Sequence, residues 1–448
     1  MNTPARSLSI LSLALLPSLT WAQSAASNVS TVSAGDNAWV LVSAALVLMM
    51  CIPGLFMFYG GLVRSKNVLS IAAQCVALTA MGILMWWAVG YSLVFGKSFA
   101  NSTLGHLFGG SEHFGFAGLG ASASSYEPRI ASGTFAVFQA MFAAITPALI
   151  IGAVAERMKF SAVMIFSLLW TLFVYYPVAH AVWGQTGDFS GLSNPQAAFK
   201  AADFAGGIVV HMTSGWSALL LCIIVGPRIG FGKRAMPPHS MVLCVLGTGL
   251  LWAGWYGFNA GSALAADGVA VQAFLTTTLG AAAATIAWAL VEKFHRGKPS
   301  VLGLCSGSIA GLATITNAAG FVSNTSAVII GLLAGVISYG ACSVLKSKMG
   351  YDDALDTFGV HGVGGTIGAL ATCLLMDKTA NVAGGALIEQ GLVRGQLLAM
   401  GLCIILSLVM TWIIAKVVAK IVQLRPSEEE EAQGLDIADH GEEGYQHN

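Results

Sequence analysis

Two stretches, Asp203-Phe-Ala-Gly-Gly-Ile-Val-Val-His211 and Asp356-Thr-Phe-Gly-Val-His361, decide how this chain of 448 residues is interpreted. Each ends in a histidine that lies inside a long apolar segment. An ionisable side chain at such depth in a bilayer is costly, and it marks a functional site by default. The alternative for each ring is a neutral structural histidine, hydrogen-bonded to a neighbouring helix.

The composition around these stretches excludes an ordinary soluble protein. Hydrophobic residues make up 56% of the chain and charged residues 9%, whereas soluble domains carry roughly 25% charged residues. The formal net charge is zero, so no basic field favours a nucleic-acid partner. The 53 glycines suit helices that pack closely in lipid.

Eleven apolar segments are long enough to cross a hydrocarbon core roughly 30 Å thick. Only helices and closed barrels satisfy their backbone polar groups in lipid, and continuous apolar runs of this length favour helices. We therefore predict an all-α polytopic membrane protein. The predicted spans are 38–60, 68–95, 131–154, 160–183, 203–226, 239–261, 269–291, 300–318, 325–345, 356–376 and 393–423.

The N-terminus has the pattern of a secretory signal. Arg6 precedes a short apolar stretch, and Thr20-Trp21-Ala22 resembles a cleavage site. We predict a signal peptide over residues 1–22, with an uncleaved first helix as the alternative. A membrane domain over 23–425 and an acidic tail over 426–448 then follow.

Charges in the loops predict the orientation. Fifteen Lys and Arg residues lie in alternate loops or after the last span, and five lie on the opposite side. The positive-inside rule places the first set and the C-terminus in the cytoplasm, and the mature N-terminus outside. The basic set is Arg64, Lys66, Arg157, Lys159, Arg228, Lys233, Arg234, Lys293, Arg296, Lys298, Lys346, Lys348, Lys416, Lys420 and Arg425.

Two inverted halves of five spans each, followed by a last helix, are the expected architecture. Spans one and six end in similar strings, Phe58-Tyr59-Gly60-Gly61 and Trp255-Tyr256-Gly257-Phe258, and each half closes with one of the two histidines. Inverted repeats place a pathway at their interface, near the middle of the membrane. We therefore expect His211 and His361 to lie side by side.

The chemistry of two buried histidines leaves several options open. Burial disfavours imidazolium, and a neutral ring offers one donor and one acceptor. The pair could bind a small polar molecule or pass a proton. The additional ligands of a zinc site are missing, while an axial haem pair stays open. The eight cysteines sit singly in apolar runs, as small packing residues do.

Asp203 and Asp356 stand at the starts of the spans that carry the histidines. We expect both to cap helix N-termini. A supporting or gating role in the pathway is the alternative.

Aromatic side chains cluster toward the ends of spans three, four and six. Belts of this kind are normal at membrane interfaces. A cluster on one side could instead hold a cation against its ring faces, at about 0.5–2 kcal/mol per contact. The residues concerned are Phe138, Phe142, Trp183, Trp255 and Phe258, with Ser262 just after them.

Together these strings resemble the ammonium transporter family (Amt/Mep/Rh), and specifically its bacterial Amt branch. The resemblance covers the whole chain after residue 22. It rests on Phe56-Met-Phe-Tyr-Gly-Gly-Leu-Val-Arg64, Gly152-Ala-Val-Ala-Glu-Arg157, Asp203-Phe-Ala-Gly-Gly207 through His211, Gly254-Trp-Tyr-Gly-Phe-Asn-Ala-Gly-Ser262 and Asp356-Thr-Phe-Gly-Val-His-Gly362.

The resemblance implies a homotrimer in the bacterial inner membrane with one pore per subunit. Matched positions imply ammonium recruitment at Phe138, Phe142, Trp183 and Ser262, and a gate of Phe142 and Phe258. They also imply a pore lined by the twin histidines, with Asp203, Trp255 and Asp356 in support. Ammonium or methylammonium is the implied substrate, and no cofactor, metal or catalytic residue is expected.

The tail carries Gly434-Leu435-Asp436 and His440-Gly441-Glu442, which look more specific than a solvated run of acidic residues. In the family this segment is involved in docking a PII-type signalling protein. A disordered acidic tail is the plainer interpretation. The function classes left open are an ammonium transporter, an ammonium sensor, an Rh-like gas channel and a haem-bearing redox enzyme.

Overall fold

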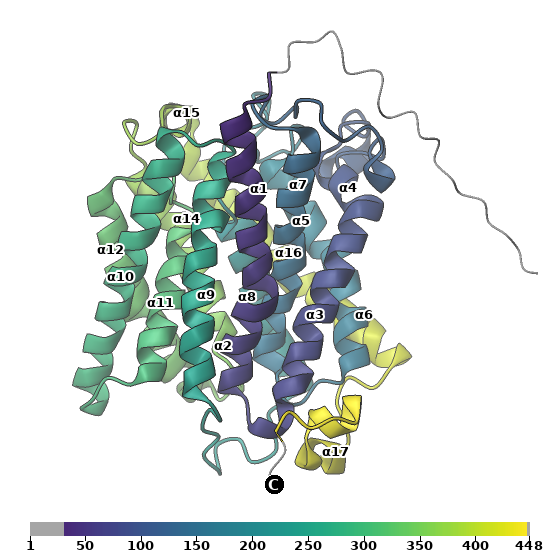
Figure 1. The fold of residues 1–448 in the computed structure, drawn as a ribbon, viewed down its shortest axis with the longest axis vertical. Coiled ribbons are helices and arrows are strands. Elements are labelled where there is room, and N and C mark those ends of the chain that lie inside the picture. Colours follow the sequence, from purple (N-terminus) through teal and green to yellow (C-terminus); the bar gives the residue numbers. More distant parts are fainter. Residues whose placement is uncertain (1–30, 446–448) are drawn as a thin grey trace, which may run out of the picture.

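The computed structural model describes residues 31–445 and consists of a bundle of antiparallel helices (Figure 1). The predicted signal peptide, residues 1–22, lies outside the described residues. The two ends of the bundle are called the N-terminal side and the tail side. The N-terminal side is the end where Ala34 begins α1, and the tail side is the end where α17, Glu428–Gln433, is placed.

Ten helical stretches within the described residues are long and apolar enough to cross a membrane, and a shorter apolar helix adds the eleventh predicted span. The stretches are Ala34–Leu62, Ser65–Phe95, Ser132–Val154, Phe160–Trp183, Gly207–Val225, Met241–Ala263, Gly268–Arg296, Asn324–Met349, Phe358–Leu375 and Leu392–Ile421, and the shorter helix is Val301–Ile315. The predicted all-helical membrane fold is confirmed.

Several stretches contain more than one α-helix because a π-helical or 3₁₀ turn interrupts them. The α-helices are α1 Ala34–Met49, α2 Leu55–Leu62, α3 Val68–Met85, α4 Tyr91–Phe95, α5 Ser132–Val154, α6 Phe160–Trp170, α7 Tyr176–Trp183, α8 Thr213–Val225, α9 Met241–Ala260, α10 Gly268–Arg296, α11 Val301–Ile315, α12 Asn324–Tyr339, α13 Lys346–Met349, α14 Gly364–Leu375, α15 Val382–Ala386, α16 Leu392–Ile421 and α17 Glu428–Gln433.

Three predicted boundaries were wrong in an informative way. The fifth span begins at Gly207 rather than 203, because residues 203–206 form a turn that caps it. The seventh runs on to Arg296, so that His295 lies in the helix and not in a loop. The eighth covers only Val301–Ile315, because a turn replaces the helix at Thr316.

The third span, α5, is the centre of the bundle. In its most apolar window 89% of the residues are buried, compared with 33% for α16, which closes the chain's membrane part. Large apolar side chains such as Leu84, Leu374 and Ile405 are exposed around the outside. A periphery of exposed apolar residues is expected where lipid is the solvent.

Both histidines lie in π-helical turns that begin the fifth and tenth spans. His211 belongs to η7, Gly207–Met212, and His361 to η10, Phe358–Val363. Single π turns inside helices are frequent at functional sites. The two spans touch backbone to backbone, because a Cβ atom on Gly215 would lie 2.0 Å from the amide nitrogen of Gly362. This contact brings the two rings together.

Candidate functional site

The two histidines meet inside the bundle as the sequence predicts. Their Nδ1 atoms lie 3.1 Å apart, and the rings are stacked at 5.1 Å between centroids with 17° between planes. Both rings are nearly completely buried. One Nδ1 must donate to the other, so the pair shares a proton while both rings stay neutral. One Nε2 is then an acceptor and the other is a donor.

An apolar cavity surrounds the pair. The indole of Trp255 lies 5.6 Å from the His211 ring at 26°, and its Nε1 donates to Thr316 Oγ1 at 2.9 Å. Nε2 of His211 is buried without a hydrogen-bond partner. The lining is Met50, Leu55, Phe58, Tyr59, Ile145, Leu149, Val210, His211, Leu251, Trp255, Phe258, Ile309 and His361. The imidazoles are thus the main polar groups available to a small molecule there.

This geometry excludes the haem-bearing redox enzyme. An iron with two axial histidines needs a porphyrin plane between the two ligating nitrogens. Rings stacked with Nδ1 atoms 3.1 Å apart leave no room for that plane. Elsewhere in residues 31–445 no three His, Cys, Asp or Glu side chains gather as metal ligands would.

Two phenylalanines close the cavity toward the N-terminal side. The Phe142 and Phe258 rings lie 4.3 Å apart at 35°, and Phe258 is 5.9 Å from His211. Phe138 packs on Phe142 edge to face at 5.0 Å. All three rings are buried. A molecule that moves toward the histidines must therefore displace aromatic rings.

A wider cavity lies on the N-terminal side of this constriction. Phe142, Trp183, Ser262 and Asp203 all line it. Trp183 meets Phe142 edge to face at 6.1 Å, and the Ser262 hydroxyl donates to the Phe258 carbonyl at 2.8 Å. The predicted recruitment and gate residues are thus brought together from spans three, four and six.

Asp203 caps the fifth span, as predicted. Its Oδ1 accepts from the N–H groups of Gly206 and Gly207 at 2.7 and 2.8 Å. Its Oδ2 accepts from Ile208 and Val209, both at 2.9 Å. Its backbone carbonyl accepts from Trp183 Nε1 at 3.0 Å. No cationic side chain among residues 31–445 forms an ion pair with this carboxylate.

The predicted cap at Asp356 is wrong, because Asp353 performs that function. Asp353 accepts from the N–H groups of Thr357 and Phe358 at 3.0 and 2.7 Å. Asp356 instead has a left-handed backbone with φ of 61° and pairs with Lys346. Asp203 and Asp353 each stand eight residues before a histidine, and this repeated spacing is a signal that the sequence did contain.

A third cavity opens on the tail side. It contains Ser306, which lies one turn from the Ile309 that lines the histidine cavity. Its charged residues are Glu292 and Arg296 from α10 together with the Lys346–Asp356 pair. The cavities on the N-terminal side and on the tail side therefore contain charged residues, whereas the histidine cavity is mainly apolar.

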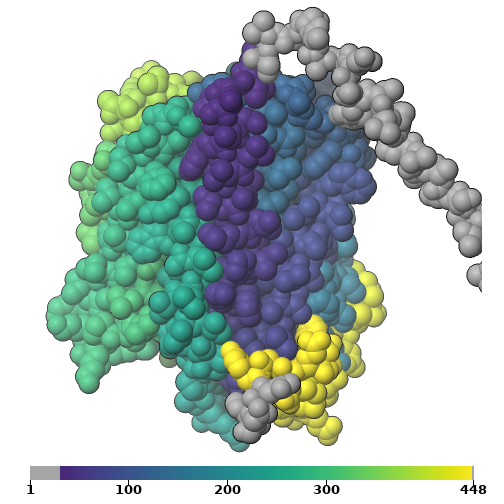
Figure 2. Space-filling view, in the orientation of Figure 1, coloured from purple at the N-terminus to yellow at the C-terminus, as the bar shows by residue number. Residues whose placement is uncertain are grey.

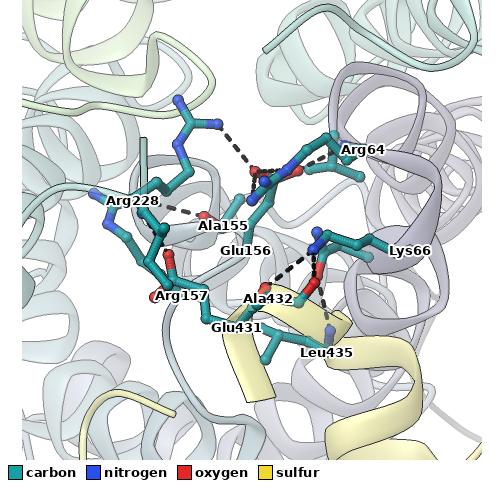
Figure 3. A network of polar contacts seen from close by, with 12 residues as sticks. Arg64, Lys66, Ala155, Glu156, Arg157, Arg228, Glu431, Ala432 and Leu435 are labelled. Carbon is teal, nitrogen blue, oxygen red and sulfur yellow. Dashed lines mark hydrogen bonds and ion pairs between the residues drawn. The ribbon is translucent and has the colours of Figure 1, made fainter. Parts of the chain in front are cut away.

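A cluster of charges holds the loops on the tail side (Figure 3). Glu156 accepts from the Arg64 backbone and guanidinium at 2.6 and 2.9 Å and from Arg228 at 3.3 Å. Arg228 also pairs with Asp352 at 2.8 Å. Burial opposes ionisation of Glu156, but the two arginines outweigh it and lower its pKa. The pKa of Asp352 is lowered in the same way by Arg228.

The acidic tail is folded against this cluster, so the interpretation of a disordered tail is wrong for residues 426–445 (Figure 2). Leu435 is buried, and its N–H donates to Asn67 Oδ1 at 2.8 Å. Asp436 accepts from the N–H of Ser70 at 2.7 Å, in the first turn of α3. Asp439 accepts from the N–H of Phe160, the first residue of α6, at 3.0 Å.

The tail therefore supplies caps that two helices lack locally. Neither α3 nor α6 receives a capping bond from its own preceding residue. Of the six predicted partner-binding residues, Gly434, Leu435 and Asp436 are buried against the same subunit. His440 is half-buried, and Gly441 and Glu442 are exposed.

His180, near the end of the fourth span, is fully buried. Its Nδ1 lies 2.8 Å from the Val94 carbonyl, and its Nε2 lies 3.0 Å from that of Gly105. It ties the long loop at 97–130 to the end of α7. The eight cysteines are buried and free, which agrees with their predicted packing role.

Comparison with known proteins gives consistent matches along most of the chain. Residues 38–445 match the Ammonium Transporter Family. The chain is 44% identical to the ammonium transporter of Bacillus subtilis (strain 168), over 92% of this chain and 98% of that protein. Its fold is similar to that of Saccharomyces cerevisiae Mep2, with a TM-score of 0.80 and 35% identity over 90% of this chain and 89% of that one. A structure described as a sensor Amt protein gives a TM-score of 0.80 and 30% identity, over 91% and 98% of the two chains.

Proposed function

Since the chain belongs to the ammonium transporter family and is a multi-pass membrane transporter, not an enzyme, we propose that it carries ammonium nitrogen through its histidine-lined cavity as ammonia. Ammonium is captured on the N-terminal side, loses a proton near Phe142 and Phe258, and crosses as a neutral molecule. The observation that carries this proposal is the pair of stacked neutral histidines inside an otherwise apolar lumen.

Desolvation decides which species crosses. Moving a bare cation into a dry medium costs tens of kcal/mol in the low-dielectric limit, as an upper bound. Cation–π contacts offset about 0.5–2 kcal/mol each. Ammonia avoids most of this cost and can donate to one imidazole nitrogen while accepting from the next. Potassium has no proton to lose, so the same step discriminates against it.

The capture site lies in the wide cavity on the N-terminal side. We assign recruitment to Phe138, Phe142, Trp183 and Ser262, with the Asp203 carboxylate as the source of negative potential. Within residues 31–445 no cationic side chain forms an ion pair with this carboxylate, which supports the assignment. Phe142 and Phe258 act as the gate that excludes water from the lumen.

The fate of the removed proton determines whether transport carries current. In one form of the proposal, the proton follows through the hydrogen bond between His211 and His361. In the other, the proton returns to water on the N-terminal side, and the rings only align ammonia. Currents on a solid-supported membrane separate the two, since an absence of ammonium-dependent current in wild-type protein would exclude the relay.

The function itself is tested by uptake of ammonium and methylammonium into proteoliposomes at varied membrane potential. We expect saturable uptake by wild-type protein. Replacement of both His211 and His361 should abolish uptake or permit leakage of other cations. Unchanged, ammonia-selective uptake by the double variant would reject their assigned role.

Orientation and assembly complete the proposal. We place the N-terminal side outside a bacterial inner membrane and the tail in the cytoplasm, as the loop charges predict. Residues 23–425 are assigned as a transporter domain that assembles as a trimer. A PII-type protein would contact the tail at Gly441 and Glu442, which are exposed, and could reach Leu435 only by displacing the tail.

A sensor role is a second candidate, favoured by the similarity to a structure described as a sensor Amt protein. The folded tail supports it, because Asp436 and Asp439 connect the tail to the starts of α3 and α6. Deletion of residues 426–448 tests it. If the protein is a transporter, the truncated variant should keep measurable ammonium uptake. If it is a sensor, the truncated variant should still bind ammonium but should no longer produce the cellular response to it.

A further inference from the structure

Ala202, the residue before the capping aspartate Asp203, is held by a buried side-chain amide from the last span. Gln396 in α16 is completely buried. Its Oε1 accepts from the N–H of Ala202 at 2.9 Å, and its Nε2 donates to the Ala202 carbonyl at 3.0 Å. Nε2 also donates to the carbonyl of Ala369 at 3.1 Å. One side chain thus binds both polar groups of a single residue.

A second buried amide, that of Asn317, also holds this loop. Nδ2 of Asn317 donates to the Ala202 carbonyl at 3.0 Å and to Thr372 Oγ1 at 2.7 Å. The backbone carbonyl of Asn317 accepts from the N–H of Phe204 at 3.2 Å. Asp203 therefore lies between two residues whose backbones are both fixed by neutral groups.

The side-chain amides of Gln396 and Asn317, together called the clamp, carry no charge, and this matters for the site. Asp203 lines the cavity on the N-terminal side, and its own bonds are to backbone N–H groups. A lysine or arginine in place of either amide could still donate to the Ala202 carbonyl, but its charge would neutralise the carboxylate. Two amides fix the position of the charge and leave its field directed at the cavity.

The last span has no counterpart in the two five-span halves, and Gln396 gives it a function. We propose that Gln396 and Asn317 are positioning residues that set cation affinity on the N-terminal side by fixing Asp203. This rests on the proposed capture of ammonium in that cavity. Loosening the clamp should weaken capture and leave the passage of ammonia through the lumen unchanged.

Methylammonium uptake into proteoliposomes tests this with Gln396→Met, which keeps the shape and removes all three hydrogen bonds. We expect KM to rise roughly fivefold to tenfold, the effect of about one lost net hydrogen-bonding interaction on binding. The maximal rate per reconstituted trimer should stay unchanged. Gln396→Glu should also raise KM, because a carboxylate cannot donate to the carbonyls of Ala202 and Ala369.

Two comparisons separate positioning from simple stability. Gln74→Met in α3 removes another buried amide, bonded to Ser70 on the tail side, and should leave KM unchanged. In an Asp203→Asn background, Gln396→Met should raise KM no further, because coupled residues are not additive.

An unchanged KM in Gln396→Met, or a fully additive effect with Asp203→Asn, would overturn the inference. A wild-type protein without saturable methylammonium uptake would instead contradict the proposed function. Failure of the clamp and failure of the function therefore give different results.

Discussion

The two ends of the pathway use the same device in opposite electrostatic settings. Asp203 on the N-terminal side and Asp353 on the tail side each accept backbone N–H groups at the start of a broken helix, eight residues before a histidine. Neutral amides hold the loop around Asp203. The loop around Asp353 is held by Lys346, which donates to its carbonyl at 3.2 Å, and by Arg157, which donates to Asp352.

This difference makes the two ends of the pathway electrostatically unequal. The capping geometry is needed at both ends because broken helices leave N–H groups unsatisfied. The charged residues around the two capping aspartates, in contrast, can differ without affecting the caps. A carboxylate without a counter-ion attracts a cation, whereas one among lysine and arginine does not. We infer that the N-terminal side binds ammonium more tightly than the tail side does.

The largest effect on KM should come from removing the carboxylate charge of Asp203 on the N-terminal side. A carboxylate about 8 Å from a cation, at an effective dielectric constant of about 20, contributes about 2 kcal/mol. Asp203→Asn should therefore raise the KM for methylammonium roughly thirtyfold. Asp353→Asn should change KM by less than about threefold, because Lys346, which donates to the Asp353 carbonyl, offsets part of the carboxylate's charge. Equal effects of the two variants would break the comparison.

The contact between the halves should be the next most sensitive point. Gly215→Ala places a Cβ atom 2.0 Å from the amide nitrogen of Gly362, so the fifth and tenth spans must move apart. We expect uptake to fall on the order of tenfold because the histidines lose alignment, with a stability loss of about 1–3 kcal/mol. Gly249→Ala in α9, whose Cβ meets no atom within 4 Å, is the matched control.

Acidification should destabilise the tail side selectively. The pKa values of Glu156 and Asp352 are lowered in the folded protein, so the stability they contribute is present above their unfolded values, about 4.3 and 3.9. It is lost as pH falls through the folded pKa values. The thermal unfolding temperature of the protein should thus fall below about pH 4.5. Glu156→Gln should be less stable near neutral pH and show a shallower decline; an identical decline would contradict this origin.

The smallest effect concerns the tail caps. Asp439→Ala removes the acceptor for the N–H of Phe160 and should cost about 1 kcal/mol, as other lost caps do. The tail should then be cleaved faster in limited proteolysis. Glu442→Ala changes an exposed residue of the same segment and should leave cleavage unchanged. Equal cleavage of both variants would show that the cap does not hold the tail.

Much of the fold and part of the site could be predicted from the sequence. Long apolar runs specify membrane helices, and His211 and His361 stood out because histidine is rare at that depth. Asp203 was identified as a cap from its place before the span. These inferences succeed because each depends on a residue type and its neighbours along the chain.

The remainder depends on contacts between distant segments. The sequence favoured Asp356 as a cap because it stands at the start of the apolar run, but in the structure it has a positive φ and pairs with Lys346. Gln396 lies 193 residues after Asp203, and nothing local indicates their connection. The acidic tail looked solvated, since its capping targets in α3 and α6 are far away in the sequence.

Paired uptake of ammonium and potassium by the same wild-type proteoliposomes tests the deprotonation step most directly. Passage as ammonia predicts saturable ammonium uptake and no potassium uptake above that of protein-free vesicles, since potassium cannot become neutral. Potassium uptake at a rate comparable to that of ammonium would contradict it, because a bare cation would then be crossing the lumen beside His211 and His361.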